Sequence, residues 1–191
     1  MTCDAYLVEG DTPTTRRYYE RYGDAFPRPD DQPSRIARDN FVFIGAVVRA
    51  STLSALGGFD PEVRVSSDYD LWIRAILNGS RLALVDEPLV YYRLRPGSLT
   101  ADPRRHWLAH LQVVERHVDA FRSRGLRVRA RAAYDLGRAA EDRGEPREAV
   151  RWYLEAARGQ PTPSLWNRTK LVGAAARARF RSPLLGRRSA G

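Results

Sequence analysis

The sequence predicts an α/β domain followed by an α-helical region. Up to residue 100, short runs rich in β-branched and aromatic residues alternate with segments of helical periodicity. After Thr100 the strand-like runs disappear, and apolar residues recur at the three- and four-residue spacing of helices. We therefore expect an α/β part at residues 1–100, a helical region at 101–180 and a flexible tail at 181–191.

Two strand-like runs stand in the first fifty residues. Residues 4–8 are expected to form a short strand that ends in a turn at 9–11. Four prolines interrupt the polar stretch 12–33, which predicts a surface loop with a short helix at 16–22. The run at 41–48 is apolar at every position but one glycine, as expected of a strand buried between layers.

A short and a longer helix follow. The short helix is expected at 52–56, ending at two consecutive glycines. Ser66 or Ser67 is a suitable N-cap for the longer helix, because a serine oxygen can accept a hydrogen bond from the first turn. That helix is expected to end at Asn78 and Gly79 and to bury one face, made of Tyr69, Trp72, Ile73 and Ile76.

Two more strands precede the helical region. Residues 82–85 and 89–92 are strand-like and flank an apparent turn at 86–88. Residues 103–123 then carry apolar side chains at helical spacing.

Composition restricts the possible classes of function. The 32 Lys and Arg against 23 Asp and Glu give a formal charge of +9, which favours anionic partners in general. Nucleic-acid binding is not favoured, because no basic stripe is interleaved with aromatic residues. Cys3 is the only cysteine, so neither an intrachain disulfide nor a cysteine-based zinc site can form. With no run of ~18 apolar residues, we expect a cytoplasmic protein, in solution or peripheral to the inner face of the membrane.

Three motifs occur in order within residues 56–98. They are Leu56-Gly57-Gly58-Phe59-Asp60, then Ser67-Asp68-Tyr69-Asp70-Leu71-Trp72-Ile73-Arg74, then Tyr92-Arg93-Leu94-Arg95-Pro96-Gly97-Ser98. Together they resemble the acceptor-side, C-terminal half of a family 2 glycosyltransferase of the GT-A fold. The resemblance implies a nucleotide-sugar transferase-like sheet with helices. It also implies an inverting transfer of a sugar from a nucleotide-sugar donor to a hydroxyl of a glycan or lipid-linked acceptor. Such a reaction would serve cell-surface polysaccharide or glycan synthesis.

The resemblance assigns the catalytic base to Asp68. Family members usually carry Glu-Asp at this helix start, and Ser67 replaces the Glu here. The chemistry needs a carboxylate because the attacking hydroxyl must lose its proton. The alternative is an acidic residue that only stabilises the first turn of a helix, where the helix dipole favours negative charge.

Five further residues are expected to bind substrate. Gly58 would allow close approach of the acceptor or would simply end a helix, and Asp60 would line the acceptor pocket or cap the residues after it. Trp72 would stack on a sugar or belong to the core. Arg93 and Arg95 match the family's Tyr-Arg-x-His beside the donor diphosphate, with Arg95 in place of His, and the alternative is a pair of exposed arginines. Phe59 is expected in the core.

A divalent metal, Mg²⁺ or Mn²⁺, is expected for the complete family enzyme. Its Asp-x-Asp ligands belong to the donor-binding half, which the resemblance places before this region. Asp68 and Asp70 do not replace it, because residues two apart on a helix point about 200° apart. Asp70 is instead expected to pair with Arg74 one turn later. No metal ligand is therefore assigned in this chain.

The helical region resembles one tetratricopeptide unit at residues 130–161. Such a unit cannot bury its face alone, so neighbouring helices are expected at 103–123 and 163–180. His106, His110 and His117 share helical spacing, and we expect them on an exposed helix surface rather than around a metal. The alternative function is a non-catalytic remnant whose helical region binds a protein partner.

Overall fold

The computed structural model describes residues 1–22, 25–95 and 103–158. The chain divides into two compact units, Met1–Leu126 and Arg127–Gly191. The boundary between the two units therefore comes after a long helix, whereas the sequence pattern already changes near residue 100. The helix expected at 163–180 and the tail at 181–191 lie outside the described residues, as do positions 96–98 of the third motif.

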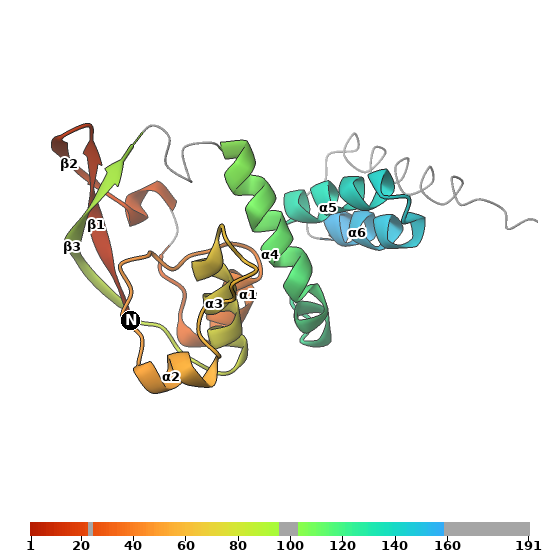
Figure 1. The fold of residues 1–191 in the computed structure, drawn as a ribbon, viewed down its shortest axis with the longest axis horizontal. Helices are drawn as coiled ribbons and strands as arrows, with labels where there is room; N and C mark the ends of the chain where they lie inside the picture. The colour runs from red at the N-terminus through yellow and green to blue at the C-terminus, as the bar shows by residue number, and fades with distance from the viewer. Residues whose placement is uncertain (23–24, 96–102, 159–191) are drawn as a thin grey trace, which may run out of the picture. The chain divides into compact units, whose positions relative to one another are not determined.

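A three-stranded sheet organises the first unit (Figure 1). Its strands are β1 (Thr2–Glu9), β2 (Thr12–Arg17) and β3 (Leu84–Leu94), in the order β2-β1-β3. β2 pairs antiparallel and β3 parallel to β1. The predicted mixed α/β class is confirmed at this level.

The segment after β1 differs from the predicted loop and helix. Gly10, at φ 62°, turns the chain into β2, which the β-branched threonines favour. Of the helix expected at 16–22 only Tyr19–Tyr22 is helical, as the 3₁₀ turn η1, because residues up to Arg17 belong to β2. A second 3₁₀ turn, η2 (Pro29–Asp31), leads into α1 (Gln32–Ile36).

The strand predicted at 41–48 is also wrong. The segment makes a single bridge, from Ala46 to Thr2, and does not join a ladder. Phe41 and Phe43 are buried as expected, but Ile44 and Val47 are each 66% exposed. Within the described residues, only part of this apolar run is therefore packed against the rest of the unit. A strand also needs a hydrogen-bonded neighbouring strand, and amino-acid composition cannot reveal whether one is present.

The turn predicted at 86–88 is wrong as well, since β3 runs through it without a break. Register shifts beside Asp4 accommodate the passage of this segment along β1. Pro88 is tolerated because β3 is an edge strand, where a missing N–H costs little.

The helices of the first unit match the predictions closely. α2 (Ala50–Ala55) ends before Gly57 and Gly58, both at positive φ. α3 (Ser67–Leu77) buries its predicted face and ends at Asn78, and α4 is Pro103–Ser123. α3 contacts both α1 and α4. Ser66 is the N-cap of α3, which confirms one of the two predicted positions, but at φ 60° its side chain makes no capping hydrogen bond.

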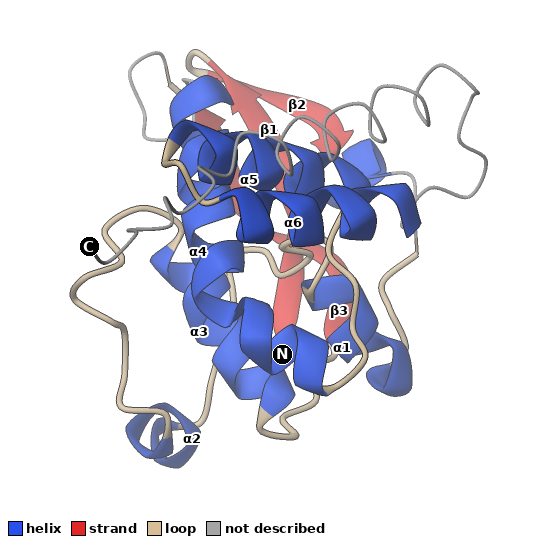
Figure 2. Cartoon of the chain, turned by 90° about the vertical axis from the view of Figure 1, so that its right-hand side faces the viewer, coloured by secondary structure: helices blue, strands red, loops and turns tan. Residues whose placement is uncertain are grey.

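The second unit contains a helical hairpin, α5 (Ala130–Asp142) and α6 (Pro146–Arg158), which lie side by side (Figure 2). Gly137 lets the helices approach, because a Cβ there would lie 2.6 Å from the ring of Tyr153. Trp152 and Tyr153 are each 1% exposed, so these two aromatic side chains belong to the core of the hairpin.

Candidate active site

A cleft of about 760 Å³ opens in the first unit at the start of α3. Its walls come from the residue before η1, the 39–48 segment, Leu53 of α2, Phe59, the 64–66 loop with α3, the end of β3, and α4. The side chains with polar or aromatic groups that line it include Tyr18, Asp39, Asn40, Phe59, Arg64, Ser67, Asp68, Trp72, Tyr92 and His106.

Asp68 lies in the first turn of α3 and lines this cleft, half-buried. Asn40 donates a hydrogen bond from Nδ2 to Asp68 Oδ2 at 3.2 Å. The amide of Asn40 is oriented by the main-chain N–H of Val42, which donates to its Oδ1 at 3.2 Å. One carboxylate oxygen is therefore held from a second segment, while Oδ1 has no hydrogen bond within the described residues.

Tyr19 fixes the segment that carries Asn40. Its hydroxyl donates to the carbonyl of Phe41 at 3.0 Å and accepts from the N–H of Phe43 at 3.0 Å. The 41–43 stretch thus obtains from a side chain the hydrogen bonds that a neighbouring strand would otherwise supply. This clamp holds Asn40 opposite the start of α3.

Asp70 points away from Asp68 into a buried ion-pair network. Arg74 Nη2 lies 2.8 Å from Asp70 Oδ2, which confirms the predicted pair. His117 Nε2 lies 2.6 Å from Asp70 Oδ1, and the aspartate side chain is 2% exposed. Arg74 also donates to the carbonyls of Leu56 at 2.7 Å and Gly58 at 2.8 Å. The network connects α3, α4 and the turn after α2.

No group of three or more acidic, histidine or cysteine side chains is arranged to hold a metal within the described residues. Asp68 and Asp70 do not converge, because one lines the cleft and the other faces α4. The described residues therefore do not fit the divalent ion that the resemblance implies.

Trp72 lines the cleft and is 6% exposed. Its indole Nε1 is buried without a hydrogen-bond partner in the described part of the chain. The ring is thus mostly core, with one surface at the cleft wall.

Two of the three histidines on α4 are not on an exposed surface, so that expectation is wrong for them. His110 is 7% exposed and stacks between Tyr69, at 4.7 Å, and Trp107, at 5.3 Å, between ring centroids. His117 contacts Asp70 as described. His106 is exposed and lines the cleft. Tyr69 and Asp70, which contact these two histidines, belong to α3, and the helical spacing within α4 does not indicate them.

Gly58 and Asp60 do not line the cleft. Gly58, at φ 73°, belongs to the turn after α2, and its carbonyl binds Arg74. Asp60 Oδ1 accepts the N–H of Glu62 at 2.8 Å, and Oδ2 lies 2.5 Å from Arg116 Nη2. Both residues therefore have the structural roles that the sequence analysis gave as alternatives.

Arg93 and Arg95 also lie outside the cleft lining. Their neighbours Tyr92 and Leu94 line it instead, because successive side chains of a strand point to opposite faces. Arg93 Nη1 is 2.5 Å from Asp11 Oδ1, and Arg95 is exposed. The structure does not bring either arginine together with Asp68.

Several residues of this site were not predicted from the sequence. Phe59 was expected in the core but is 55% exposed and lines the cleft. Asn40 could have been found as the polar residue directly before the apolar run at 41–48. Tyr18, Tyr92 and Arg64 carry no comparable signal, since only the tertiary fold brings them to the cleft.

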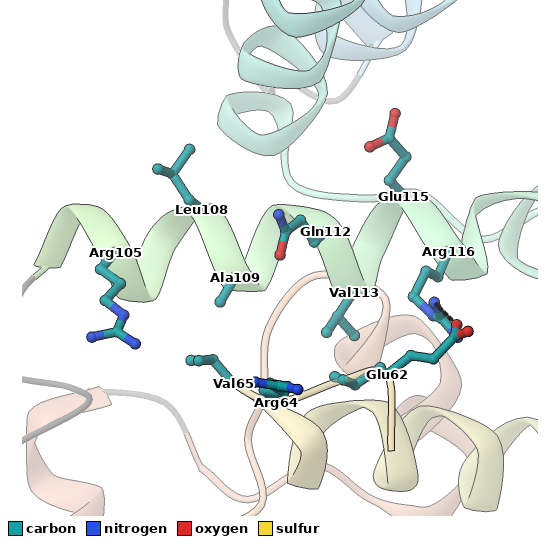
Figure 3. Close-up of a pocket in the computed structure, with 11 residues that line it drawn as sticks. Glu62, Arg64, Val65, Arg105, Leu108, Ala109, Gln112, Val113, Glu115 and Arg116 are labelled. Atoms are coloured by element: carbon teal, nitrogen blue, oxygen red, sulfur yellow. Dashed lines mark hydrogen bonds and ion pairs between the residues drawn. The ribbon is translucent and has the colours of Figure 1, made fainter. Parts of the chain in front are cut away.

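A second cavity, of about 890 Å³, lies between the 62–65 loop and α4 (Figure 3). Arg116 spans it to Glu62 at 3.2 Å, and this contact, with the charge of Asp60, raises the pKa of Arg116 above its usual value. Figure 3 shows Arg64 beneath the helix, with Ala109 and Val113 pointing toward the loop. Arg64 and Val65 border both cavities.

Comparison with models of protein families, with curated proteins and with solved structures finds no match. The geometry of the cleft and the resemblance of its motifs are therefore the grounds for assigning a function. No described helix combines the length and apolar character needed to cross a bilayer.

Proposed function

We propose that this chain is part of a family 2-like inverting glycosyltransferase and that Asp68 is its catalytic base. The observation that carries the proposal is the position of Asp68: it is the acidic residue that the motif resemblance selects, and its carboxylate lines a cleft of about 760 Å³. A residue that only stabilised the first turn of α3 would not need a second segment to hold its side chain, yet Asn40 does so.

In the proposed reaction the acceptor hydroxyl binds at Oδ1 of Asp68. Its oxygen attacks the anomeric carbon as the bond to the nucleoside diphosphate breaks, and the leaving group takes that electron pair. The hydroxyl proton passes to the carboxylate. Asn40, by occupying Oδ2, directs the other oxygen to the substrate.

The cleft walls suit a carbohydrate acceptor. Tyr18, Phe59 and Tyr92 contribute aromatic surface, on which the apolar faces of sugar rings can pack, and Arg64 and His106 add hydrogen-bond donors. The 55% exposure of Phe59 is favourable for this role, because an exposed apolar ring gains from being covered by a ligand.

The test is a transfer assay with a panel of nucleotide sugars and with glycan or lipid-linked hydroxyl acceptors. Asp68→Asn should lower kcat by a factor on the order of 10² to 10⁴ while leaving the thermal unfolding temperature nearly unchanged. Asp39→Asn, the same change at a second carboxylate of the cleft, is the control and should keep most of the activity. Full activity in the Asp68 variant would exclude this base.

Titration of the chain with nucleoside diphosphates in the presence of Mg²⁺ or Mn²⁺ tests the donor side. Binding at or below millimolar ligand is expected of an enzyme that is complete in this chain. Absence of binding, together with absence of transfer, would favour the non-catalytic alternative.

A further inference from the structure

The cavity between the 62–65 loop and α4, called the loop–helix cavity below, is separate from the chemistry proposed at Asp68. Its volume of about 890 Å³ is within the range of roughly 300–1,000 Å³ that is typical of small-molecule sites. The loop forms one wall. The other wall is a face of α4 that includes Arg105, Leu108, Ala109, Gln112, Val113 and Arg116.

The floor of the loop–helix cavity is apolar. Ala109 and Val113 point from α4 toward the loop (Figure 3), and they are 7% and 1% exposed. Val63, which lines the cavity from the loop, is 9% exposed. These three side chains are thus held by the core of the unit. A hydrocarbon chain that lay on them would gain free energy by leaving water.

Arg64 supplies positive charge next to this floor. Its side chain lies beneath α4 (Figure 3), and it has no hydrogen bond or ion pair within residues 1–22, 25–95 and 103–158. Arg105 points from α4 toward the same loop, so a second guanidinium lies on that side of the helix. A guanidinium can hold a phosphate through two parallel hydrogen bonds.

The carboxylates that line the cavity do not neutralise Arg64. Glu62 is bound to Arg116 at 3.2 Å, and Arg116 also binds Asp60 at 2.5 Å. Glu115 points away from the loop, on the other side of α4 (Figure 3). The formal charge of +9 attracts anions to the chain as a whole. An anionic group is therefore favoured at Arg64 over a cationic one.

We propose that the loop–helix cavity binds an amphipathic phosphate monoester, with its apolar chain on Val63, Ala109 and Val113 and its phosphate at Arg64. Arg64 borders both this cavity and the cleft, so the phosphate lies where the two meet. A single molecule is favoured over a membrane surface, because the apolar floor lies between the loop and α4, where a flat bilayer does not reach. Binding here does not require catalysis at Asp68.

The test is titration of the full chain with octyl phosphate below its critical micelle concentration. Calorimetry measures the affinity, and the amide shifts of α4 and of the 62–65 loop locate the ligand. Binding is expected, with the shifts concentrated in these two segments. Inorganic phosphate lacks the apolar chain and octanol lacks the charge, so each should bind at least about tenfold more weakly.

Variants of exposed residues separate a built site from general attraction to a basic protein. Arg64→Gln removes the phosphate partner and should raise Kd about tenfold or more. Arg38→Gln makes the same change at an exposed arginine that borders neither cavity, and this control should bind normally. Gln112 is exposed and lines the cavity, so Gln112→Glu should weaken binding and Gln112→Lys should strengthen it.

Three results would each overturn the proposal: no binding at millimolar octyl phosphate, an unchanged Kd in the Arg64→Gln variant, or an equal loss of affinity in the Arg38→Gln control. Sedimentation with vesicles that contain phosphatidic acid distinguishes the two sources of a phosphate monoester. A chain that binds these vesicles but not monomeric octyl phosphate would recognise a membrane surface, which would also overturn the cavity site.

Discussion

Asparagine at Asp70 should destabilise the first unit far more than asparagine at Asp68. Both aspartates lie in the first turn of α3, but their surroundings differ. Asp70 is buried, with Arg74 Nη2 at 2.8 Å and His117 Nε2 at 2.6 Å. Asp68 is half-buried and accepts one side-chain hydrogen bond, from Asn40 at 3.2 Å.

The expected loss of stability depends on which charged or polar group each substitution leaves without its partner. Removing one member of a buried ion pair costs about 3–5 kcal/mol, because the other charge stays buried. The Arg74 side chain is 23% exposed and keeps its hydrogen bonds to two carbonyls, so its uncompensated charge is partly solvated. We therefore expect about 2–4 kcal/mol for Asp70→Asn. The same change at Asp68 should cost less than about 1 kcal/mol.

The assay is thermal and urea unfolding at neutral pH, followed through the amide protons of α3 so that the second unit does not contribute. At about 4 °C per kcal/mol for a unit of this size, Asp70→Asn should lower the midpoint by roughly 8–16 °C. Free energies of unfolding that agree within about 1 kcal/mol between the two variants would refute the argument. That result would mean that the network around Asp70 does not hold α3 against α4.

Two predictions concern the α5–α6 hairpin. Gly137→Ala should lower the free energy of unfolding of the hairpin by about 1–3 kcal/mol, because the new Cβ would lie 2.6 Å from the ring of Tyr153. Urea unfolding followed by α5 amide exchange measures this change. A variant as stable as the unaltered chain would show that the ring can move aside. Burial and the hydrogen bond to Glu141 raise the pKa of Tyr153 above its usual 10.0, so the neutral phenol is favoured in the folded state. This stabilisation is complete below the unfolded pKa of about 10 and is lost as pH rises toward the folded pKa. The free energy of unfolding of the hairpin should therefore fall above pH ~10, and Tyr153→Phe should remove this pH dependence. An unchanged pH dependence in the variant would contradict the assignment of the effect to Tyr153.

The helices could be predicted from the sequence because their signals are local. In α3 the buried face repeats every three to four residues, and Asn78 and Gly79 end it where expected. The strands could not be placed equally well, because pairing joins distant segments. The 41–48 run has strand composition without a ladder, whereas β3 passes through Asp86, Glu87 and Pro88 because β1 holds it there.

Of the predicted site residues, only Asp68 and Trp72 line the candidate cleft. The residues around Asp68 reach the cleft from distant parts of the chain: Asn40 is held there by the clamp of Tyr19. The motif also favoured Arg93 and Arg95 over Tyr92, yet the alternation of β3 turns Tyr92 to the cleft. Position within a motif identifies the segment but not the face.

Several described residues of the three motifs have a structural role in this fold. Arg74 binds the carbonyls of the turn after α2 and the carboxylate of Asp70, so it ties the Gly-Gly turn to the helix that follows. Asp60 closes its own turn and binds Arg116 on α4. Asp68 differs from these residues, because its partner Asn40 occupies one carboxylate oxygen and the other is left at a cleft. A helix start alone does not require that arrangement, which is the reason to look for chemistry at Asp68 rather than at its more strongly bonded neighbours.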